Sequence, residues 1–161
     1  MIPDSVPRIG LGWDRHSLVE NRPCILGGVP IPNAVGPSGH SDADVLLHAL
    51  CDALLGAAGL DDLGTMFPDA EPQWKGAAST QFVEAAMKLL RAKKLQVASA
   101  DLVVICDTPK LSPHRDVIRE NLAQMLELPV DRVNLKGKTT EGGSGGAIEV
   151  QAVVLLVNRN D

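Results

Sequence analysis

Aromatic side chains are scarce in this chain of 161 residues, which has two Phe, two Trp and no Tyr. Apolar residues of all kinds still make up 45% of it, so we expect a core of aliphatic side chains. Proteins that bind single-stranded nucleic acid stack bases on aromatic rings, and this chain offers few. Its formal net charge of −5 also gives no basic footprint for a polyanion. We therefore expect no nucleic-acid partner.

Long apolar runs are missing as well, and none approaches the roughly 18 residues that a membrane span needs. Residues 1–7 lack the charged segment and apolar run of a secretory signal. Cys24, Cys51 and Cys106 form no C-x-x-C pair and are odd in number, which favours buried free thiols in a reducing compartment. We expect one cytoplasmic domain over residues 1–161, without a membrane partner.

The most informative stretch is residues 40–52, HSDADVLLHALCD. Its apolar residues recur at helical spacing, and the pattern predicts a helix that Ser41 caps. Asp44, His48 and Asp52 recur every four residues, so they should lie along one side of that helix. Ionisable groups on so apolar a helix need a partner. The two interpretations are a solvated face and the edge of a metal or substrate site.

A second pair of candidate ligands, Asp14 and His16, follows a predicted first strand over residues 8–13. In an extended chain both side chains point to one face, although a charged strand end in water would give the same pattern. Together with His48 they would form a set of two imidazoles and one carboxylate. Catalytic zinc is commonly held by three such ligands. One of the helical aspartates, Asp44 or Asp52, could then orient an imidazole through its second nitrogen.

The remaining patterns predict an α/β (α+β) single domain in a ferredoxin-like arrangement, with a mixed four-stranded sheet, helices on one face and a small hairpin. Helical crossovers imply some parallel pairing. The apolar run 101–106 suggests a strand buried on both faces. The predicted elements are a hairpin over 24–32, helices over 40–59, 78–94 and from 112 or 113 to 128, a long loop over 60–76, and further strands over 133–138 and 147–157.

Five segments carry a family resemblance: Asp14-Arg15-His16; His40 to Asp44 with His48; Asp62-Leu63-Gly64 with Phe67-Pro68-Asp69; Pro109-Lys110-Leu111; and Lys138-Thr139-Thr140-Glu141. In order and spacing they resemble the 2-C-methyl-D-erythritol 2,4-cyclodiphosphate synthase family of the non-mevalonate isoprenoid pathway. The resemblance extends from about residue 8 to residue 157.

This resemblance implies a lyase-type intramolecular phosphoryl transfer. The substrate would be 4-diphosphocytidyl-2-C-methyl-D-erythritol 2-phosphate, whose 2-phosphate attacks the β-phosphorus while CMP leaves. It further implies Zn²⁺, or another divalent transition metal, on Asp14, His16 and His48. A second ion, Mg²⁺ or Mn²⁺, would be held by Glu141.

The resemblance also implies roles for many other residues. His40 and Thr139 would stabilise the transition state, and the helix N-terminus near Ser41 would offer donors to anionic oxygens. The full set implied to contact substrate is Asp14, Arg15, His16, His40 and Ser41 near the phosphates; Asp62, Leu63, Gly64, Phe67, Pro68, Asp69, Ala70 and Glu71 over the methylerythritol; Cys106, Asp107, Thr108, Pro109, Lys110, Leu111 and Ser112 around the cytidine; and Lys138, Thr139, Thr140 and Glu141.

Members of this family are homotrimers with interfacial active sites, so the resemblance implies that the metal ligands of one chain face the cytidine segment of a neighbour. The chain departs from the family at Gly142 to Gly146, where relatives carry a longer segment with an aromatic residue and an arginine that line a pocket on the trimer axis. The resemblance therefore does not settle whether isoprenoid diphosphates regulate this chain through that pocket. Lys138 and Asp107 also depart from common family residues, and we expect them to tune affinity.

Two other functions share the same ligands. A metal-dependent phosphohydrolase would use a metal-bound water and release orthophosphate. A non-catalytic trimeric scaffold would bind zinc and turn nothing over. The synthase would instead release a cyclic diphosphate and CMP, so the products separate the three hypotheses.

Overall fold

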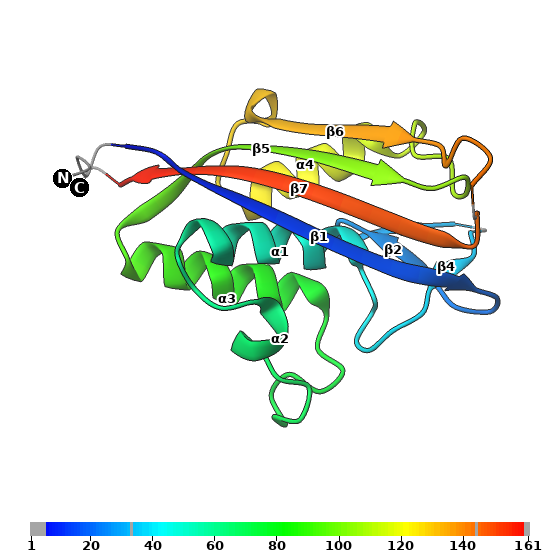
Figure 1. Cartoon of the computed structure of the whole chain (residues 1–161), viewed down its shortest axis with the longest axis horizontal. Coiled ribbons are helices and arrows are strands. Elements are labelled where there is room, and N and C mark those ends of the chain that lie inside the picture. Colours follow the sequence, from blue (N-terminus) through cyan, green and yellow to red (C-terminus); the bar gives the residue numbers. More distant parts are fainter. Residues whose placement is uncertain (1–5, 33, 144, 160–161) are drawn as a thin grey trace.

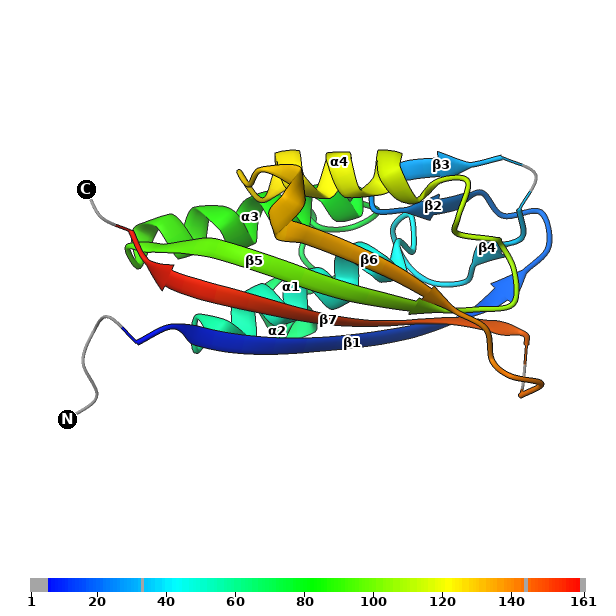
Figure 2. The same ribbon diagram turned by 90° about the horizontal axis from the view of Figure 1, so that it is seen from above.

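The computed structural model describes residues 6–32, 34–143 and 145–159. It is one mixed α+β domain in which the helices cover one face of a five-stranded sheet (Figures 1 and 2). The elements are β1 (Arg8–Val19), β2 (Cys24–Leu26), β3 (Val29–Ile31), β4 (Gly36–Pro37), α1 (Val45–Ala57), α2 (Leu63–Met66), α3 (Ser79–Ala92), β5 (Leu95–Ile105), α4 (Arg115–Met125), a 3-10 turn (Val130–Arg132), β6 (Val133–Lys138) and β7 (Ala147–Asn158).

The strands lie in the order β4-β1-β7-β5-β6. β5 and β6 are parallel and joined through α4, whereas the other neighbours are antiparallel, so the prediction of a mixed sheet is confirmed. The predicted strand number of four is wrong, because β4 pairs with the end of β1 at Leu18 and Val19. The ferredoxin-like order β-α-β-β-α-β does not fit either, since three helices, α1 to α3, separate β1 from β5 and the last two strands follow one another.

The first strand is longer than predicted and continues through Asp14 and His16 to Val19. It continues because β7 supplies ladder partners as far as the pair Ser17–Ala147. Asp14 and His16 therefore lie inside a paired strand rather than at a strand end. Main-chain hydrogen bonds to β7 fix their backbone on one side.

Helix α1 begins later than the sequence pattern suggested, and its N-cap is Asp44 rather than Ser41. Ser41 and Ala43 have φ angles of 56° and 53°, which lie in the left-handed region and cannot start a right-handed helix. The Ser41 hydroxyl instead accepts a long hydrogen bond of 3.4 Å from the N–H of Ala43. Similarly, α4 begins at Arg115, after the predicted start at residue 112 or 113, and its N-cap is His114.

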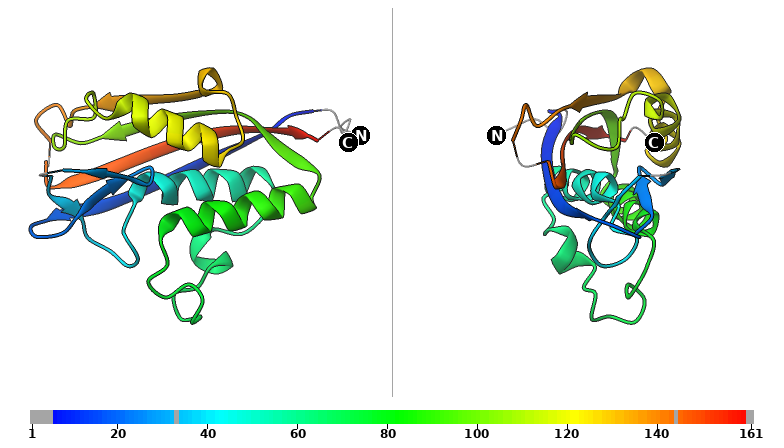
Figure 3. Two further views of the ribbon diagram at one scale, coloured as in Figure 1. Left: turned by 180° about the vertical axis from the view of Figure 1, so that it is seen from behind. Right: turned by 90° about the vertical axis from the view of Figure 1, so that its right-hand side faces the viewer.

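The core is aliphatic, as the composition predicts, and α1 lies in its centre between the sheet and α3 (Figure 3). The strand predicted to be buried on both faces, β5, alternates instead: Leu102 and Val104 are buried, but Val103 is only partly covered. No described element covers the other face of the sheet. The apolar side chains exposed there or at its edge include Ile9, Leu11, Trp13 and Val153.

The predicted hairpin is confirmed, with β2 and β3 turning at Gly27 and Gly28. The turn packs closely on the helices: a Cβ atom on Gly27 would lie 2.7 Å from a methyl carbon of Ile118 in α4. The three cysteines are buried free thiols, also as predicted. Among the described residues, no helix combines the length and apolarity needed to cross a bilayer.

Candidate functional site

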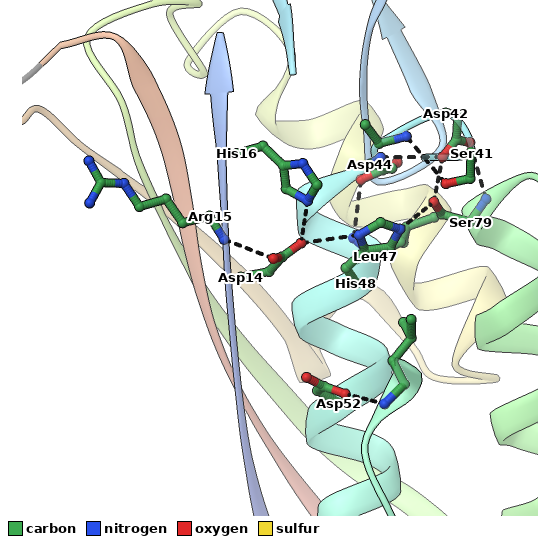
Figure 4. Close-up of polar contacts among 12 residues, drawn as sticks. Asp14, Arg15, His16, Ser41, Asp42, Asp44, Leu47, His48, Asp52 and Ser79 are labelled. Carbon is green, nitrogen blue, oxygen red and sulfur yellow. Dashed lines mark hydrogen bonds and ion pairs between the residues drawn. The ribbon is translucent and has the colours of Figure 1, made fainter. Parts of the chain in front are cut away.

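Three side chains predicted to bind a metal converge between β1 and α1 (Figure 4). The Oδ2 atom of Asp14 lies 2.9 Å from Nε2 of His16 and 3.1 Å from Nδ1 of His48. One potential ligand atom from each side chain lies within 4.8 Å of the other two. Within the described ranges this is the only such cluster of His, Cys, Asp and Glu. The spatial meeting of strand and helix that the sequence could only suggest is therefore present.

The outer hydrogen bonds of the two imidazoles decide which nitrogen faces Asp14 with a lone pair. Nδ1 of His16 contacts the carbonyl oxygen of Ser38, which can only accept, so this nitrogen carries the hydrogen. Nε2 of His48 lies 3.0 Å from the hydroxyl oxygen of Ser79. That hydroxyl donates its own hydrogen to Asp42, so Nε2 of His48 is the donor there.

It follows that the inner atoms of Asp14, His16 and His48 are all acceptors in the neutral rings. Acceptors that converge within hydrogen-bond distance need a positive charge between them, either a proton or a metal ion. The donor set of two imidazole nitrogens and one carboxylate oxygen fits zinc or a similar divalent transition metal.

The pKa values of Asp14 and His16 shift for this reason. Burial alone would raise the pKa of Asp14, but the hydrogen bonds and charges of His16 and His48 outweigh it and lower that pKa well below its usual range. The hydrogen bond to Asp14 raises the pKa of His16 above its usual 6.5, against the opposite effect of burial. Without a metal, a proton on His16 thus takes the place of the cation.

Neither Asp44 nor Asp52 orients an imidazole, so that prediction is wrong. As the N-cap, Asp44 turns its carboxylate across the helix end, where it accepts the N–H groups of Gly27 at 3.0 Å, Gly28 at 2.7 Å and Leu47 at 3.1 Å. It is completely buried, and burial raises its pKa to about 6. Asp52 accepts the N–H of Leu63 at 2.7 Å.

The residues that do orient His48 on its outer side, Ser79 and Asp42, escaped the sequence analysis. Ser79 lies at the start of α3, 31 residues from His48. The only sequence signals were its position at a predicted helix start and the Asp42 side chain inside the HSDAD segment. Neither signal indicates that the two residues meet.

A pocket of about 360 Å³ lies on the helix-covered face of β5 and β6. It brings together two segments that the family resemblance assigned to substrate, the loop after β5 and the end of β6. Thr108 does not line it, and Val104 and Arg115 complete its wall. The lining residues are Val104, Cys106, Asp107, Pro109, Lys110, Leu111, Ser112, Arg115, Gly137, Lys138 and Thr139.

The predicted magnesium ligand Glu141 lies beyond the end of β6, in an exposed turn. The Thr139 hydroxyl donates to its carboxylate at 2.5 Å. The turn is tied to the pocket because Asp107 accepts the N–H of Thr140 at 2.9 Å and its hydroxyl at 2.6 Å. These bonds lower the pKa of Asp107. Within one chain, Glu141 is not part of the Asp14 cluster.

The metal ligands and the pocket lie at the same level of the sheet but not beside each other. The ladder pairs Asp14 with Val150, Val150 with Val104, and Val104 with Gly137. Two strand spacings of about 4.8 Å separate Asp14 from the pocket residue Val104 and three separate it from Gly137, which is about 10 to 14 Å. One chain thus carries two half-sites on one face.

The other predicted contact residues lie on the metal side or remain exposed. Asp62 caps α2, and the adjacent Leu63 is bonded to Asp52, one helical turn from His48. Phe67 is buried, with its ring 5.6 Å from that of Phe82. The remaining predicted contact residues of this group are half-exposed or exposed: Arg15, His40, Ser41, Gly64, Pro68, Asp69, Ala70 and Glu71.

Comparison with known proteins gives a consistent result. The sequence model of the YgbB family matches residues 7–157. A 2-C-methyl-D-erythritol 2,4-cyclodiphosphate synthase of Clostridium perfringens is 49% identical over 154 residues, which span 93% of this chain and 99% of the relative. A solved synthase structure in a CDP-bound form has a TM-score of 0.90 at 46% identity, covering 92% of this chain and 99% of the other. IspF of Plasmodium falciparum, as a CDP complex, has a TM-score of 0.83 at 35% identity, covering 97% and 99%.

Proposed function

Because this chain belongs to the YgbB family, together with 2-C-methyl-D-erythritol 2,4-cyclodiphosphate synthases, we propose that it converts 4-diphosphocytidyl-2-C-methyl-D-erythritol 2-phosphate to 2-C-methyl-D-erythritol 2,4-cyclodiphosphate and CMP. An oxygen of the 2-phosphate forms a bond to the β-phosphorus. The bond from that phosphorus to the bridging oxygen breaks, and CMP leaves with this oxygen. No water is consumed, so the reaction is that of a phosphorus-oxygen lyase.

The observation that carries this proposal is the pairing of two half-sites with complementary chemistry. One is the cluster of Asp14, His16 and His48, whose inner acceptors call for a cation. The other is the pocket of about 360 Å³ at β5 and β6, which is large enough for part of a nucleotide. A substrate with a base at one end and phosphates at the other suits such a pair, as do relatives solved with CDP.

The metal chemistry follows from the donor set. Asp14, His16 and His48 would hold Zn²⁺ or another divalent transition metal, and Glu141 would be a ligand of Mg²⁺ or Mn²⁺. When bound, such ions withdraw negative charge from phosphate oxygens and align them.

The work of the protein side chains is mainly positioning, because phosphoryl transfer asks for little covalent chemistry. We assign the pocket from Cys106 to Ser112 to the cytidine, and the loop from Asp62 to Glu71 to the methylerythritol. His40 and Thr139 would lie beside the reacting phosphates and stabilise the transition state. Bringing both ends of a flexible polyanion together costs conformational entropy. A site shaped for the folded substrate lowers this part of the barrier, because the entropy is lost on binding.

We further propose a homotrimer in which the metal cluster of one chain faces the pocket of the next. Two features support this assembly. The half-sites of one chain are two to three strand spacings apart, or about 10 to 14 Å, and the uncovered sheet face exposes Leu11 at 69% and Trp13 at 54%. Contiguous exposed apolar side chains of this kind mark interaction surfaces. Three buried free thiols suit a reducing compartment, and we assign the enzyme to the cytoplasm.

The decisive experiment is incubation of the purified protein with this substrate, Zn²⁺ and Mg²⁺, followed by phosphorus NMR. A cyclic diphosphate and CMP, lost on treatment with a chelator, are the expected products. Free orthophosphate would instead indicate a metal-dependent phosphohydrolase. Tight zinc binding without any turnover would indicate a scaffold.

A further inference from the structure

Behind His48, on the side away from Asp14, lie two residues to which no role has been assigned. The hydroxyl oxygen of Ser79 is 3.0 Å from Nε2 of His48, and Asp42 contacts the same hydroxyl (Figure 4). We propose that Asp42 and Ser79, the Asp42–Ser79 pair, are positioning residues that hold His48 in the tautomer and orientation that bind the metal. This inference rests on the proposed metal centre, but not on the reaction carried out there.

The direction of each hydrogen bond follows from what the Asp42 carboxylate accepts. Oδ2 accepts the main-chain N–H of Ser79 at 3.2 Å, and Oδ1 accepts the N–H of Asp44 at 3.2 Å. Oδ1 also accepts the Ser79 hydroxyl. Because main-chain donors lie on both oxygens, the carboxylate is the acceptor in its contact with the Ser79 hydroxyl. The serine hydrogen is therefore committed to Asp42, and the serine oxygen is left as an acceptor.

An acceptor at this position selects one tautomer of His48. The ring must carry its hydrogen on Nε2, so Nδ1 presents a lone pair toward Asp14, 3.1 Å away. If the serine oxygen were absent, the ring would gain by moving its hydrogen to Nδ1 and donating it to the Asp14 carboxylate. That tautomer blocks the metal-binding lone pair. Outer hydrogen bonds that fix ligand tautomers in this way are a general feature of metal sites.

The burial of Ser79 argues that its hydroxyl serves this contact. Its exposed fraction is 0%, and it begins α3 without being the N-cap, which is Ala78. A buried hydroxyl is costly unless it is hydrogen-bonded, and an alanine would continue the helix at least as well. Asp42 in turn comes from the turn before α1, 37 residues away. The Asp42–Ser79 pair therefore joins the beginnings of both helices behind the metal ligand.

The test uses the full-length chain, stripped of metal and then titrated with Zn²⁺ against a chromophoric chelator. We expect Ser79→Ala to weaken zinc binding by about 10- to 100-fold, the usual effect of losing an outer hydrogen bond to a ligand. In nitrogen NMR of the metal-free protein, at a pH where His48 is neutral, the wild type should show hydrogen on Nε2. Ser79→Ala should show hydrogen on Nδ1 or a mixture.

A second variant and a matched control keep the outcome clear. Asp42→Asn must turn an amide N–H₂ toward one of the present donors, so it should shift the tautomer and zinc affinity in the same direction. If Ser79→Ala does not fold, zinc titration and nitrogen NMR of Asp42→Asn test the proposal instead. Gln81→Ala changes an exposed residue in the same turn of α3 and should behave as wild type.

The inference is overturned if the substituted protein keeps the Nε2 hydrogen and binds zinc within twofold of wild type. A purely structural role for Ser79 would give this result together with a lower stability. A wild type that binds no zinc at all would instead refute the metal centre. A wild type with zinc but without cyclase turnover would refute the proposed reaction and leave the Asp42–Ser79 pair in place.

Discussion

Gly12 of β1 lies directly against Ala49 of α1: a Cβ atom on Gly12 would be 1.8 Å from the Ala49 carbonyl oxygen. No side chain fits in this gap, so strand and helix are in backbone contact. Asp14 follows Gly12 by two residues on the same face of the strand, and His48 precedes Ala49. The absence of a side chain at Gly12 thus sets how closely the metal ligands of the two elements approach.

Substitution Gly12→Ala should separate β1 from α1, since a Cβ atom has no space there. We expect a loss of about 1–3 kcal/mol in the free energy of unfolding, typical of overpacking, and weaker zinc binding. Chemical denaturation and zinc titration measure the two effects. The matched control is Gly56→Ala in α1, where a Cβ atom meets nothing within 4 Å and should stabilise the helix by about 0.5–1 kcal/mol. Equal stabilities of the two variants would contradict the prediction.

Removal of the helical ligand in His48→Ala should abolish both zinc binding and turnover while the fold survives. The side chain is partly exposed, so its loss leaves no large sealed cavity. Circular dichroism checks the fold, and metal analysis after dialysis checks the zinc content. His114→Ala alters an imidazole outside the metal cluster and should retain zinc. A near-normal rate in His48→Ala would count decisively against the assignment.

The stabilisation that zinc gives should grow as the pH rises. The pKa of His16 is raised above 6.5 in the metal-free folded protein. The hydrogen bond of protonated His16 to Asp14 therefore stabilises the metal-free fold fully below pH 6.5, and this stabilisation is lost as the pH rises through the raised pKa. Zinc competes with the same proton, so it binds more weakly at low pH. Thermal unfolding with and without Zn²⁺ should therefore show a difference in Tm that increases from pH 6 to pH 8. A difference independent of pH would exclude His16 as a ligand.

Asp44 should make stability fall as the pH rises through the mildly acidic range. Its pKa rises from 3.8 to about 6 on folding, so between these values the folded state binds more protons than the unfolded state. The Asp44→Asn variant lacks this titration. Between pH 4 and pH 7 its free energy of unfolding should therefore rise relative to that of the wild type by up to about 3 kcal/mol, since each pKa unit is about 1.4 kcal/mol. Urea unfolding of both proteins at pH 4 and pH 7 gives this difference, and parallel pH profiles would disprove it.

Lys138 lines the pocket, so its charge should tune the affinity for substrate without being essential. We expect Lys138→Ala to raise KM for the cytidine substrate several-fold, because one positive charge near the phosphates is lost. The value of kcat should change little. Lys88→Ala, on the exposed side of α3, controls for the loss of a surface charge. Complete inactivity of Lys138→Ala would refute this view.

Local patterns predicted most of the helices and strands, and they singled out the three residues that converge between β1 and α1. The spacing of Asp14 and His16 placed both on one strand face, and the apolar run around His48 placed it on a buried helix. These predictions succeed because each depends on the period of a single element. The pairing of strand with helix came from the family resemblance, and the structure explains it through the small residues Gly12 and Ala49.

Other features depend on contacts between distant segments, which no local pattern encodes. Asp44 is the helix cap because Ser41 and Ala43 adopt left-handed angles that the tertiary structure imposes. Ser79 faces His48 only because α3 begins beside the first turns of α1. The short strand β4 exists only because β1 extends to Val19.

With no tyrosine in the chain, its ultraviolet emission originates almost entirely from two indoles in different surroundings. Trp13 is on the uncovered sheet face, where its Nε1 donates to Glu149 at 2.8 Å, and Trp74 packs edge-on against Phe67. Replacing Trp74 with Phe would leave a single fluorophore that tests the proposed trimer, since it would report on subunit dissociation during dilution. Replacing Trp13 instead would leave one that follows the loop over the half-site as ligand enters, so both events can be observed without any added label.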